Sequence, residues 1–485
     1  MTQRNADAER QGEGTPTYDV LVVGGGASGL SAAHTLAAKG RRVALLERAG
    51  EVGGNLWTQR DGDWQTEIGP NTLIMKPPLY ALLRELGMLD EAQSANAQAR
   101  KRFVAFDGRP VALPTHLMGA FNNPLIGRSG WAGILREPFV RCRTTSEPSE
   151  KGLDDQSPDE ESLADFVARR LGRRVLEYMV DPFVSGVYAG DPARLSAQAA
   201  MPRLVALERE YGSLIRGGLT RLYQSRRAPS SLPSEWRGRL VSFPQGLQRL
   251  AEGLACAIRA KGGEIHCHCE ISRLHQTAQG WHLVDTTGRS FRARELVLAT
   301  SAPVAAGLLA PLDPALAAPL EAIAYPPVNA IALGFRDEDI EHPLDGFGLL
   351  IPAAERRRTL GVLFSSTLFP DRAPDGHKLL NAFIGGRRQP EAAEGDDNAL
   401  VAQVIHDLRD LLGIRAAPVW QRVSRWPRAI PQYELGHLAR LERLDEALSH
   451  HEGLSLLGNW RDGIAVGDCL ENGRRLGERL SAGQA

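Results

Sequence analysis

Residues 18–47 read YDVLVVGGGASGLSAAHTLAAKGRRVALLE, and this stretch decides the fold. A short apolar, β-branched run from Tyr18 to Val23 stops at glycines, as a strand buried in a parallel sheet does. An alanine-rich segment from Ser28 to Lys39 follows and ends at a glycine, which is typical of a helix. The run from Arg42 to Glu47 is a second apolar strand. We therefore predict a strand–helix–strand unit.

Gly24, Gly26 and Gly29 form G-x-G-x-x-G directly between the first strand and the helix. Gly24 permits the tight turn, Gly26 lets the backbone approach a pyrophosphate, and Gly29 lets helix and strand pack closely. The N–H groups and the dipole of the helix N-terminus favour phosphates. Glu47 ends the second strand, where its carboxylate can accept hydrogen bonds from ribose hydroxyls. This order predicts a dinucleotide site. The alternative is a glycine-rich turn that only joins two elements.

The composition is that of a globular protein. A chain of 485 residues exceeds one ordinary core, so we expect two or three domains, or one with large insertions. A net charge of -1 gives no sign of the basic stripe that nucleic-acid binding needs. We expect residues 1–17 to form a loose tail that is neither a signal peptide nor an anchor. The apolar, uncharged stretch at 296–312 contains two prolines and is too short to cross a bilayer.

The five cysteines are few and odd in number, which favours a reducing compartment without a disulfide framework. The run His266-Cys267-His268-Cys269 suggests a metal site. On an extended segment, however, the two histidines would point to one face and the two cysteines to the other. With no second cluster nearby, we predict no metal site.

Further elements are predicted from the periodicity of apolar residues and from the glycines and prolines that separate them. We expect a polar, acidic loop between Cys142 and Ser162, and a helix from Ser162 to Val180. The remaining predictions are a helix at 247–261, strands at 264–274, 281–285, 291–300 and 454–457, and a helix at 470–480.

Two further segments favour FAD over NAD. After Glu47 and Arg48 comes a second backbone-only element, Gly53-Gly54-Asn55. Near the C-terminus, residues 458–466 (GNWRDGIAV) precede a helix whose N-terminus could stabilise negative charge on a reduced flavin. Both segments resemble those of the flavin amine-oxidase superfamily, in which an N-terminal and a C-terminal element share one FAD. Many members carry arginine where this chain has Asn55, so we expect a different local contact there.

From Tyr18 to about Leu480 the chain resembles the oxygen-dependent protoporphyrinogen oxidases of plastid and bacterial type. The motifs that carry this resemblance are 67–72 (EIGPNT), 181–192 (DPFVSGVYAGDP), 346–352 (GFGLLIP), 360–374 (LGVLFSSTLFPDRAP) and 426–437 (WPRAIPQYELGH). It implies an α/β fold with α+β insertions: a Rossmann-like FAD-binding domain, a mixed-sheet substrate domain and a helical insertion. The FAD-binding domain would take residues 18–75, 235–305 and 420–485. The substrate domain would take 76–94, 196–234 and 306–419, and the insertion 95–195.

The resemblance also implies site residues. Contacts with FAD, held non-covalently, are expected at Gly24, Gly25, Gly26, Ala27, Ser28, Gly29, Glu47, Arg48, Asn55, Gly69, Pro70, Asn71, Thr72, Ile271, Asn459, Ile464, Ala465 and Val466. Within this set, Ile271 would lie by the adenine, and Asn459 with 464–466 by the isoalloxazine. For the substrate, Arg102 would pair with a propionate, Leu350 and Phe364 would sandwich pyrrole rings with Leu333 beside them, and the backbone at Ala189 and Gly190 would face the pyrrole N–H groups.

These assignments suit the substrate that the resemblance implies. A porphyrinogen has apolar rings, carboxylates and pyrrole donors, so it needs apolar walls, a cation at the rim and backbone carbonyls. The expected reaction removes hydrogen from the macrocycle, with oxygen as the final acceptor. Since the cofactor supplies the redox chemistry, no catalytic acid–base side chain is expected. Without the resemblance, Arg102 would be read as an ordinary surface arginine, and Leu350 and Phe364 as core.

Three alternatives stay open. The first is coproporphyrinogen III oxidation, which extra basic residues at the pocket rim would favour; Arg216, Arg221, Arg226 and Arg227 leave room for it. The second is an amine oxidase or carotenoid desaturase, although Cys469 stands in Gly-Asp-Cys and not in a Ser-Gly-Gly-Cys attachment motif. The third is a tetrapyrrole carrier without turnover.

Localisation and assembly are less constrained. The helical region of the family often lies against a membrane, and residues 113–134 are mildly apolar here. Both a cytoplasmic enzyme and a peripheral one on the inner face of the cytoplasmic membrane fit the sequence, as does a homodimer.

Overall fold

The computed structural model describes residues 18–114, 117–142, 160–227 and 231–482. Two compact units, each built from separate segments of sequence, make up the chain. Unit 1 takes residues 1–56, 248–321 and 443–485, and unit 2 takes 57–247 and 322–442. The expected tail at 1–17 and most of the expected acidic loop lie outside the described residues.

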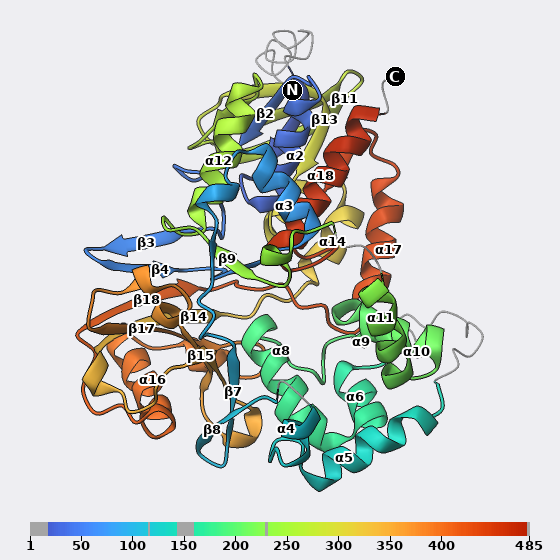
Figure 1. Ribbon diagram of the computed structural model, residues 1–485. Helices are drawn as coiled ribbons and strands as arrows, with labels where there is room; N and C mark the ends of the chain where they lie inside the picture. The colour runs from blue at the N-terminus through green and yellow to red at the C-terminus, as the bar shows by residue number, and fades with distance from the viewer. Residues whose placement is uncertain (1–17, 115–116, 143–159, 228–230, 483–485) are drawn as a thin grey trace. The chain divides into compact units, whose positions relative to one another are not determined.

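Unit 1 contains a seven-stranded sheet in the order β10-β2-β1-β13-β12-β11, with β19 paired to β13 (Figure 1). Its strands are β1 (Tyr18–Val23), β2 (Val43–Leu46), β10 (Glu264–His266), β11 (Ile271–Thr277), β12 (Gly280–Asp285), β13 (Ser290–Leu298) and β19 (Leu454–Leu456). The pairs formed by β1, β2, β10, β13 and β19 are parallel, and β12 pairs antiparallel with β11 and β13. Val20, Leu21 and Val22 have no exposed surface, as a central parallel strand requires.

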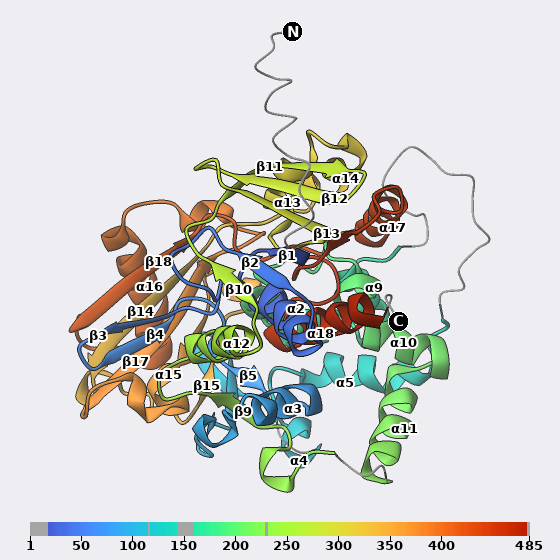
Figure 2. The ribbon, with the colours of Figure 1, turned by 90° about the horizontal axis from the view of Figure 1, so that it is seen from above.

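The helices of unit 1 include α2 (Ala27–Ala38), α12 (Gln248–Ala260), α13 (Ala302–Leu309), α14 (Pro314–Glu321) and α18 (Val466–Ala482). Helix α2 packs on β1 and β2, and α12 and α18 both pack against α2 (Figure 2). The strand–helix–strand unit is confirmed, with each boundary within one residue of its predicted place.

Unit 2 contains a second seven-stranded sheet, in the order β18-β14-β17-β16-β15-β7-β8. Its strands are β7 (Lys101–Phe106), β8 (Arg109–Ala112), β14 (Val328–Arg336), β15 (Gly346–Leu350), β16 (Thr359–Phe364), β17 (His377–Gly385) and β18 (Trp420–Trp426). All its pairs are antiparallel except β15 with β7, so the sheet is mixed. Helix α16 (Asp397–Leu412) packs its apolar side on this sheet and completes the core.

Smaller elements of unit 2 surround the sheet. Strands β3 (Thr58–Asp61) and β4 (Trp64–Glu67) form a hairpin, and β5 (Leu73–Ile74), β9 (Leu240–Ser242) and β6 (Gln93–Ser94) form a three-stranded sheet. The helices include α3 (Pro77–Glu85), α4 (Leu117–Phe121), α5 (Gly127–Arg136), α6 (Leu163–Leu171), α8 (Asp181–Tyr188), α9 (Ala197–Ala200), α10 (Pro202–Tyr211) and α11 (Leu214–Arg227). The helical part therefore continues past residue 195 to Arg227.

The single helix predicted for 162–180 is wrong. Helix α6 stops at Leu171 because Gly172 adopts φ 88°. The chain restarts as α7 (Arg173–Val175), continues as a π-helix, Leu176–Val180, and passes into α8. Pro182 explains the wide turn, since in a regular helix its ring would meet the carbonyl of Tyr178.

The single strand predicted for 264–274 is also wrong. Strand β10 ends at His266 and β11 begins at Ile271, with His268 at φ 51° between them. The run of histidines and cysteines is therefore bent, and the alternation that we used to separate its side chains does not apply. Among the residues described, no group of three or more His, Cys, Asp or Glu side chains is arranged to hold a metal ion.

Candidate functional site

The glycine-rich turn after β1 is packed tightly against neighbouring backbone. Gly24 N donates to Leu46 O at 2.8 Å, and Gly24 has φ 106°. A Cβ on Gly24 would lie 2.5 Å from Ala299 O, and a Cβ on Gly29 would lie 2.0 Å from Gly24 O. The protein's own packing therefore requires glycine at both positions.

Gly26 differs from its neighbours because its surroundings are open. It is the N-cap of α2, with φ -76° and ψ 180°, which any residue can adopt. A Cβ on Gly26 would meet no described protein atom within 4 Å. The first turn of α2 carries no acidic residue. Open space before the N–H groups of a helix N-terminus fits the pyrophosphate of a dinucleotide.

The Glu47 carboxylate closes the turn from the side of β2. Its Oε2 accepts from Gly25 N at 2.6 Å, and its Oε1 accepts from Ala49 N at 2.8 Å. A carboxylate has about four acceptor positions, so two remain for ligand hydroxyls. Glu47 thus holds the turn through these two hydrogen bonds, a structural role that the sequence did not reveal, and its contact with a ribose stays a prediction. Arg48 beside it is exposed.

The second pair of glycines lies against the first turn. Gly53 N donates to Gly25 O at 2.8 Å, and Gly26 and Gly53 form a parallel bridge. A Cβ on Gly54 would lie 3.0 Å from the Cα of Gly26. The two backbone-only elements therefore form one surface, and Asn55 is exposed just beyond it.

The bend between β10 and β11 crosses the end of β2. Glu47 N donates to His266 O at 2.9 Å, and Cys269 N donates to Glu47 O at 2.8 Å. Ile271, two residues beyond Cys269, is 8% exposed at the start of β11. These hydrogen bonds bring Ile271 to the same end of the sheet as Glu47, although the two are far apart in sequence.

The C-terminal loop reaches this end of the sheet from β19. Leu457 N donates to Leu298 O at 3.0 Å, and the buried Trp460 donates from Nε1 to Thr300 O at 3.1 Å. Asn459 lies half-buried in this loop. Ile464 and Ala465 precede α18, and Val466 is its first residue. Helix α18 starts four residues earlier than the sequence predicted.

Helices α2 and α18 run in the same direction. Ser31 Oγ donates to Leu470 O at 2.6 Å, near the start of both helices, and a Cβ on Gly477, further along α18, would lie 2.7 Å from Thr35 Cβ. Both N-termini therefore lie at one end of unit 1, beside Gly24–Gly29 and the loop at 458–465. Two helix dipoles with positive ends together suit an anionic cofactor.

In unit 2, the motif EIGPNT begins at a buried carboxylate. Glu67 accepts from Thr58 Oγ1 at 2.7 Å and from Leu247 N at 3.0 Å, and its Oε1 lies 3.4 Å from Arg372 Nη2. Burial raises the pKa of Glu67 and lowers the pKa of Arg372. Breaking such a buried pair by removing one partner is strongly destabilising. The pair anchors the end of β4 where the turn starts.

Gly69, Pro70, Asn71 and Thr72 form the half-buried turn itself. Asn71 Nδ2 donates to Gly69 O at 3.0 Å, and Asn381 Nδ2 donates to Asn71 Oδ1 at 3.1 Å. The turn is thus tied to the middle of the sheet through β17.

Arg102 lies exposed on β7, with its guanidinium carbon 5.5 Å from the centre of the Phe347 ring. The neighbouring Lys101 pairs with Asp345, whereas Arg102 makes no ion pair with any residue that the structure describes. An arginine held by stacking, with its N–H groups uncommitted to a carboxylate, is suited to bind one from a ligand.

The three apolar candidates do not share one environment. Leu350 is half-buried, and a Cβ on Gly186 of α8 would lie 2.4 Å from Leu350 Cδ2, so the two elements pack closely there. Leu333 and Phe364 have no exposed surface and belong to the core between the sheet and α16. Leu350 thus keeps some exposed surface, whereas Leu333 and Phe364 have none.

Residues 27–480 match the model of a family described as flavin containing amine oxidoreductases. The chain belongs to this family. The protein is therefore an oxidoreductase with FAD as its cofactor, and the open dinucleotide turn of unit 1 fits that cofactor.

Named relatives span nearly the whole chain. Protoporphyrinogen oxidase 2 of Arabidopsis thaliana is 31% identical over 96% of this chain and 94% of its own length. Coproporphyrinogen III oxidase of Bacillus subtilis (strain 168) is 26% identical over 94% of this chain and 96% of its own length. A crystal structure from Exiguobacterium sp. 255-15, described as a provisional protoporphyrinogen oxidase, has a TM-score of 0.77 at 23% identity, covering 97% of this chain and all of its own. The last likeness shows the flavin-oxidoreductase fold.

The motif at 181–192 in this family member is held by a loop that sequence reasoning missed. Ala189 caps α8 at φ 49°, and its carbonyl accepts from Arg387 N at 2.7 Å. Arg388 pairs with Asp181 at the start of α8 and lies 3.8 Å from Asp191 beyond its end. The loop at 385–389 therefore contacts both ends of α8 and fixes the position of Ala189 and Gly190.

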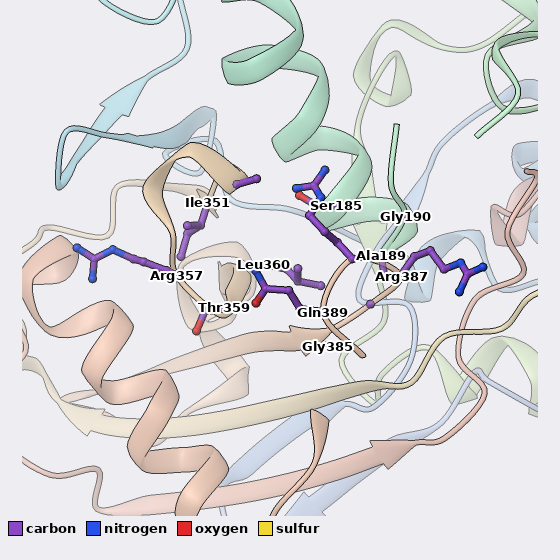
Figure 3. A pocket seen from close by; sticks show the side chains of 13 residues that line it. Ser185, Ala189, Gly190, Ile351, Arg357, Thr359, Leu360, Gly385, Arg387 and Gln389 are labelled. Atoms are coloured by element: carbon purple, nitrogen blue, oxygen red, sulfur yellow. The ribbon is translucent and has the colours of Figure 1, made fainter. Parts of the chain in front are cut away.

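A small cavity of about 20 Å³ lies beside this contact, lined by Ser185, Ala189, Gly190, Ile351, Ala353, Arg357, Thr359, Leu360 and 385–389. It has room for one or two water molecules and not for a macrocycle. Figure 3 shows the guanidinium ends of Arg357 and Arg387 pointing away from it in opposite directions. This cavity is part of the packing around α8 and not a ligand site.

Asn381 and Arg388 are the clearest residues that the sequence analysis did not select. Asn381 is 1% exposed in the centre of an apolar strand, HKLLNAFIG. An asparagine interrupting such a run is the available signal, because a buried amide must have partners. For Arg388, the double glycine before two arginines at 385–388 could have indicated a tight contact with another backbone.

Proposed function

We propose that the protein oxidises protoporphyrinogen IX to protoporphyrin IX, with oxygen as the electron acceptor, in tetrapyrrole biosynthesis. The supporting observation is the end-to-end match, at 31% identity, to a protoporphyrinogen oxidase within a flavin-containing family. The FAD, held non-covalently, supplies the redox chemistry. The chain binds and orients the macrocycle and keeps water away from it.

The residues of unit 2 suit the parts of this substrate. Arg102 binds one propionate through its exposed guanidinium. Leu350 provides an apolar wall, and the backbone at Ala189 and Gly190 faces the pyrrole N–H groups. Leu333 and Phe364 act behind this wall, since both are fully buried. No acid or base is needed from a side chain, and the catalytic set contains none.

Coproporphyrinogen III is the second candidate substrate, and a named relative at 26% identity acts on it. It carries four propionates, and burying an unpaired carboxylate costs several kcal/mol. Among the extra arginines considered for it, Arg221 already pairs with Glu210 at 3.1 Å, and Arg216 is exposed on α11. The side chains of Arg226 and Arg227 lie outside the described residues. Arg102 is the one arginine that the resemblance assigns to a propionate, which favours the substrate with two propionates over the one with four.

Competition between the two porphyrinogens tests this choice. Equal concentrations are given to the purified enzyme in air, and the porphyrin products are separated and measured. We expect protoporphyrin to predominate. Predominant coproporphyrin would refute the assignment and direct attention to α11.

Anaerobic titration separates an enzyme from a carrier. Porphyrinogen added without oxygen should bleach the flavin absorbance in proportion to the amount added. Binding of porphyrinogen without bleaching of the flavin would indicate a tetrapyrrole carrier and not an oxidase. Burial raises the pKa of the Cys469 thiol to about 11, so this cysteine stays neutral at physiological pH, consistent with a flavin that is not covalently attached.

We also propose that the helical part of unit 2 contacts a membrane surface from one side. Phe139 is 80% exposed, Leu135 69% and Leu219 63%, on neighbouring elements, with Arg136 and Arg216 among them. Large exposed apolar side chains with basic neighbours are typical of interfacial binding. No helix among the described residues is long and apolar enough to span a bilayer. Sedimentation with anionic vesicles tests the contact, and light scattering without lipid tests the homodimer that the sequence also allows.

A further inference from the structure

Helix α8 of unit 2 is short and has an irregular turn at each end. The π-helix at Leu176–Val180 precedes it, and Ala189, a residue with a side chain, follows it at φ 49°. This left-handed conformation is unfavourable for any residue that has a Cβ. Eight residues are also too few to form a stable helix alone in water. Contacts with other parts of unit 2 must therefore hold α8 in place.

Helix α8 packs on its neighbours but leaves apolar side chains exposed. Val184 has no exposed surface and belongs to the core of the helical part, and Gly186 lies against Leu350 on β15. Phe183 and Val187 are 41% and 50% exposed. Positions i, i+3 and i+4 share one side of a helix, so Phe183, Gly186 and Val187 are neighbours. The exposed apolar side therefore lies next to the half-buried Leu350.

Phe183, Val187 and Leu350 thus form one apolar surface, to which a helix and a sheet of the same unit contribute (Figure 1). A macrocycle with apolar rings gains free energy from contact with such a surface. Its orientation is a separate requirement, because a displacement of about 1 Å can slow a reaction about a hundredfold. A surface made from two elements can orient a ligand only if α8 and β15 keep a fixed relative position.

One carboxylate ties α8 to two strands of the sheet. Asp181, in the first turn of α8, has a side chain that is 9% exposed. One of its oxygens accepts from Ala353 N at 3.0 Å, just beyond β15, and the other pairs with Arg388, just beyond β17. Arg388 also lies 3.8 Å from Asp191, which follows the end of α8. The several N–H groups of a guanidinium allow one side chain to serve both carboxylates.

We propose that Arg388 is a positioning residue for oxidation of the macrocycle. Through Asp181 it fixes α8 against β15, so that the surface formed by Phe183, Val187 and Leu350 orients the substrate. Arg388 itself does not contact the substrate. The proposal rests on the proposed function, because it assigns this orientation to the macrocycle that is oxidised.

The decisive variant is Arg388→Gln, which removes the cation, and its two half-reactions are measured separately. Anaerobic stopped-flow mixing with protoporphyrinogen gives the rate of flavin reduction, and mixing of chemically reduced enzyme with oxygen gives the rate of reoxidation. We expect reduction at saturating substrate to slow about tenfold, because a displaced surface orients the macrocycle poorly. Reoxidation does not depend on that orientation and should stay within about twofold of wild type. Arg388→Lys keeps the charge without the fork and should lie between the two.

Hydrogen exchange tests the hold on α8 without any substrate. Amides in peptides that cover α8 should exchange about tenfold faster in Arg388→Gln than in wild type, because opening of the helix then breaks fewer contacts. Exchange in α16, which packs on the same sheet without contacting Arg388 or Asp181, should not change.

Arg194 provides the matched control. It pairs with Glu434 Oε1 at 3.0 Å in the same unit, and Glu434 keeps a second partner in Arg387. Arg194→Gln should leave flavin reduction and the exchange of α8 within about twofold of wild type. A double-mutant cycle tests the route through Asp181. Arg388→Gln should slow flavin reduction much less in an Asp181→Asn background than in wild type.

Unchanged flavin reduction in Arg388→Gln would overturn the proposal, as would equal slowing of reoxidation, unchanged exchange in α8, additive effects in the cycle or an equal loss in Arg194→Gln. If Arg388→Gln does not fold, Arg388→Lys and its cycle with Asp181→Asn decide. Failure of the proposed function is recognised separately, because protoporphyrinogen would then not reduce the flavin of the wild type. Hydrogen exchange would still report whether Arg388 holds α8.

Discussion

Gly26→Val should produce a folded protein that does not hold flavin. A Cβ on Gly26 meets no described atom within 4 Å, and its φ of -76° with ψ 180° suits a β-branched residue. The unfolding free energy of the apoprotein should therefore stay within about 1 kcal/mol of wild type, since a less flexible unfolded chain offsets a poorer N-cap. The new side chain fills the space for the pyrophosphate. Even modest overpacking of about 1–3 kcal/mol weakens binding roughly 5- to 150-fold.

Two glycines serve as controls for this variant. Gly29→Ala places a Cβ 2.0 Å from Gly24 O, so it should unfold the unit as well as remove flavin. Gly307→Val lies in the same unit, on α13, where a Cβ also meets nothing within 4 Å, and it should keep full flavin. Flavin-to-protein absorbance ratios and thermal unfolding of apoprotein provide the readouts. Full flavin occupancy in Gly26→Val would refute the inference that the pyrophosphate lies at Gly26. Unfolding of that variant would refute the inference that a side chain has free space there.

Three other variants test single features. Arg102→Ala should raise KM for protoporphyrinogen about ten- to a hundredfold through loss of roughly 1.5–3 kcal/mol of binding free energy, with flavin content unchanged. Lys101→Ala, which removes the neighbour that pairs with Asp345, is the control. Equal effects of the two variants would show that Arg102 is an ordinary surface arginine. Gly473→Ala places a Cβ 2.3 Å from Ser28 O and should lower the unfolding free energy by about 1–3 kcal/mol in denaturant titrations. Burial lowers the pKa of His342; Asp345 opposes this shift and Lys101 adds to it. The unfolded state therefore takes up the proton first, so the free energy of unfolding falls as pH drops below about 6.5. His342→Gln should flatten that fall in pH-dependent thermal unfolding; an unchanged slope would exclude His342 as its source.

Local sequence was sufficient to predict the dinucleotide turn. The periodicity of residues 18–47 changes from strand to helix to strand, and glycines stand where backbone approaches backbone. The same reasoning did not predict the end of α6, because Gly172 looks like any helix glycine until its φ of 88° is known. Nor did it predict the bend at His268, where β10 and β11 separate to cross the end of β2.

Contacts between distant segments limited the prediction of the site. Sequence patterns gave Glu47 a role toward ribose but not its hydrogen bond to Gly25 N, which depends on how β2 lies beside the turn. The resemblance placed Leu333 and Phe364 toward the substrate, and that role stays a prediction; the structure shows that register with β17 and packing on α16 leave neither side chain exposed. Asn381 was missed because its partners are more than 300 positions away.

The order in which unit 1 is assembled has a consequence for biosynthesis. Strand β1 is made well before its parallel partner β13, with more than 260 residues between them, and α18 follows later still. The nascent chain thus carries the complete G-x-G-x-x-G long before the surface that covers α2 exists. The packed form of α2 therefore exists only after residues 466–482 have been made. A chain ending before Val466 would keep every glycine of the motif but would expose the face of α2 that carries Ser28, Ser31 and Thr35. We therefore expect proteases to degrade such a product, so that it does not accumulate as an enzyme of low activity.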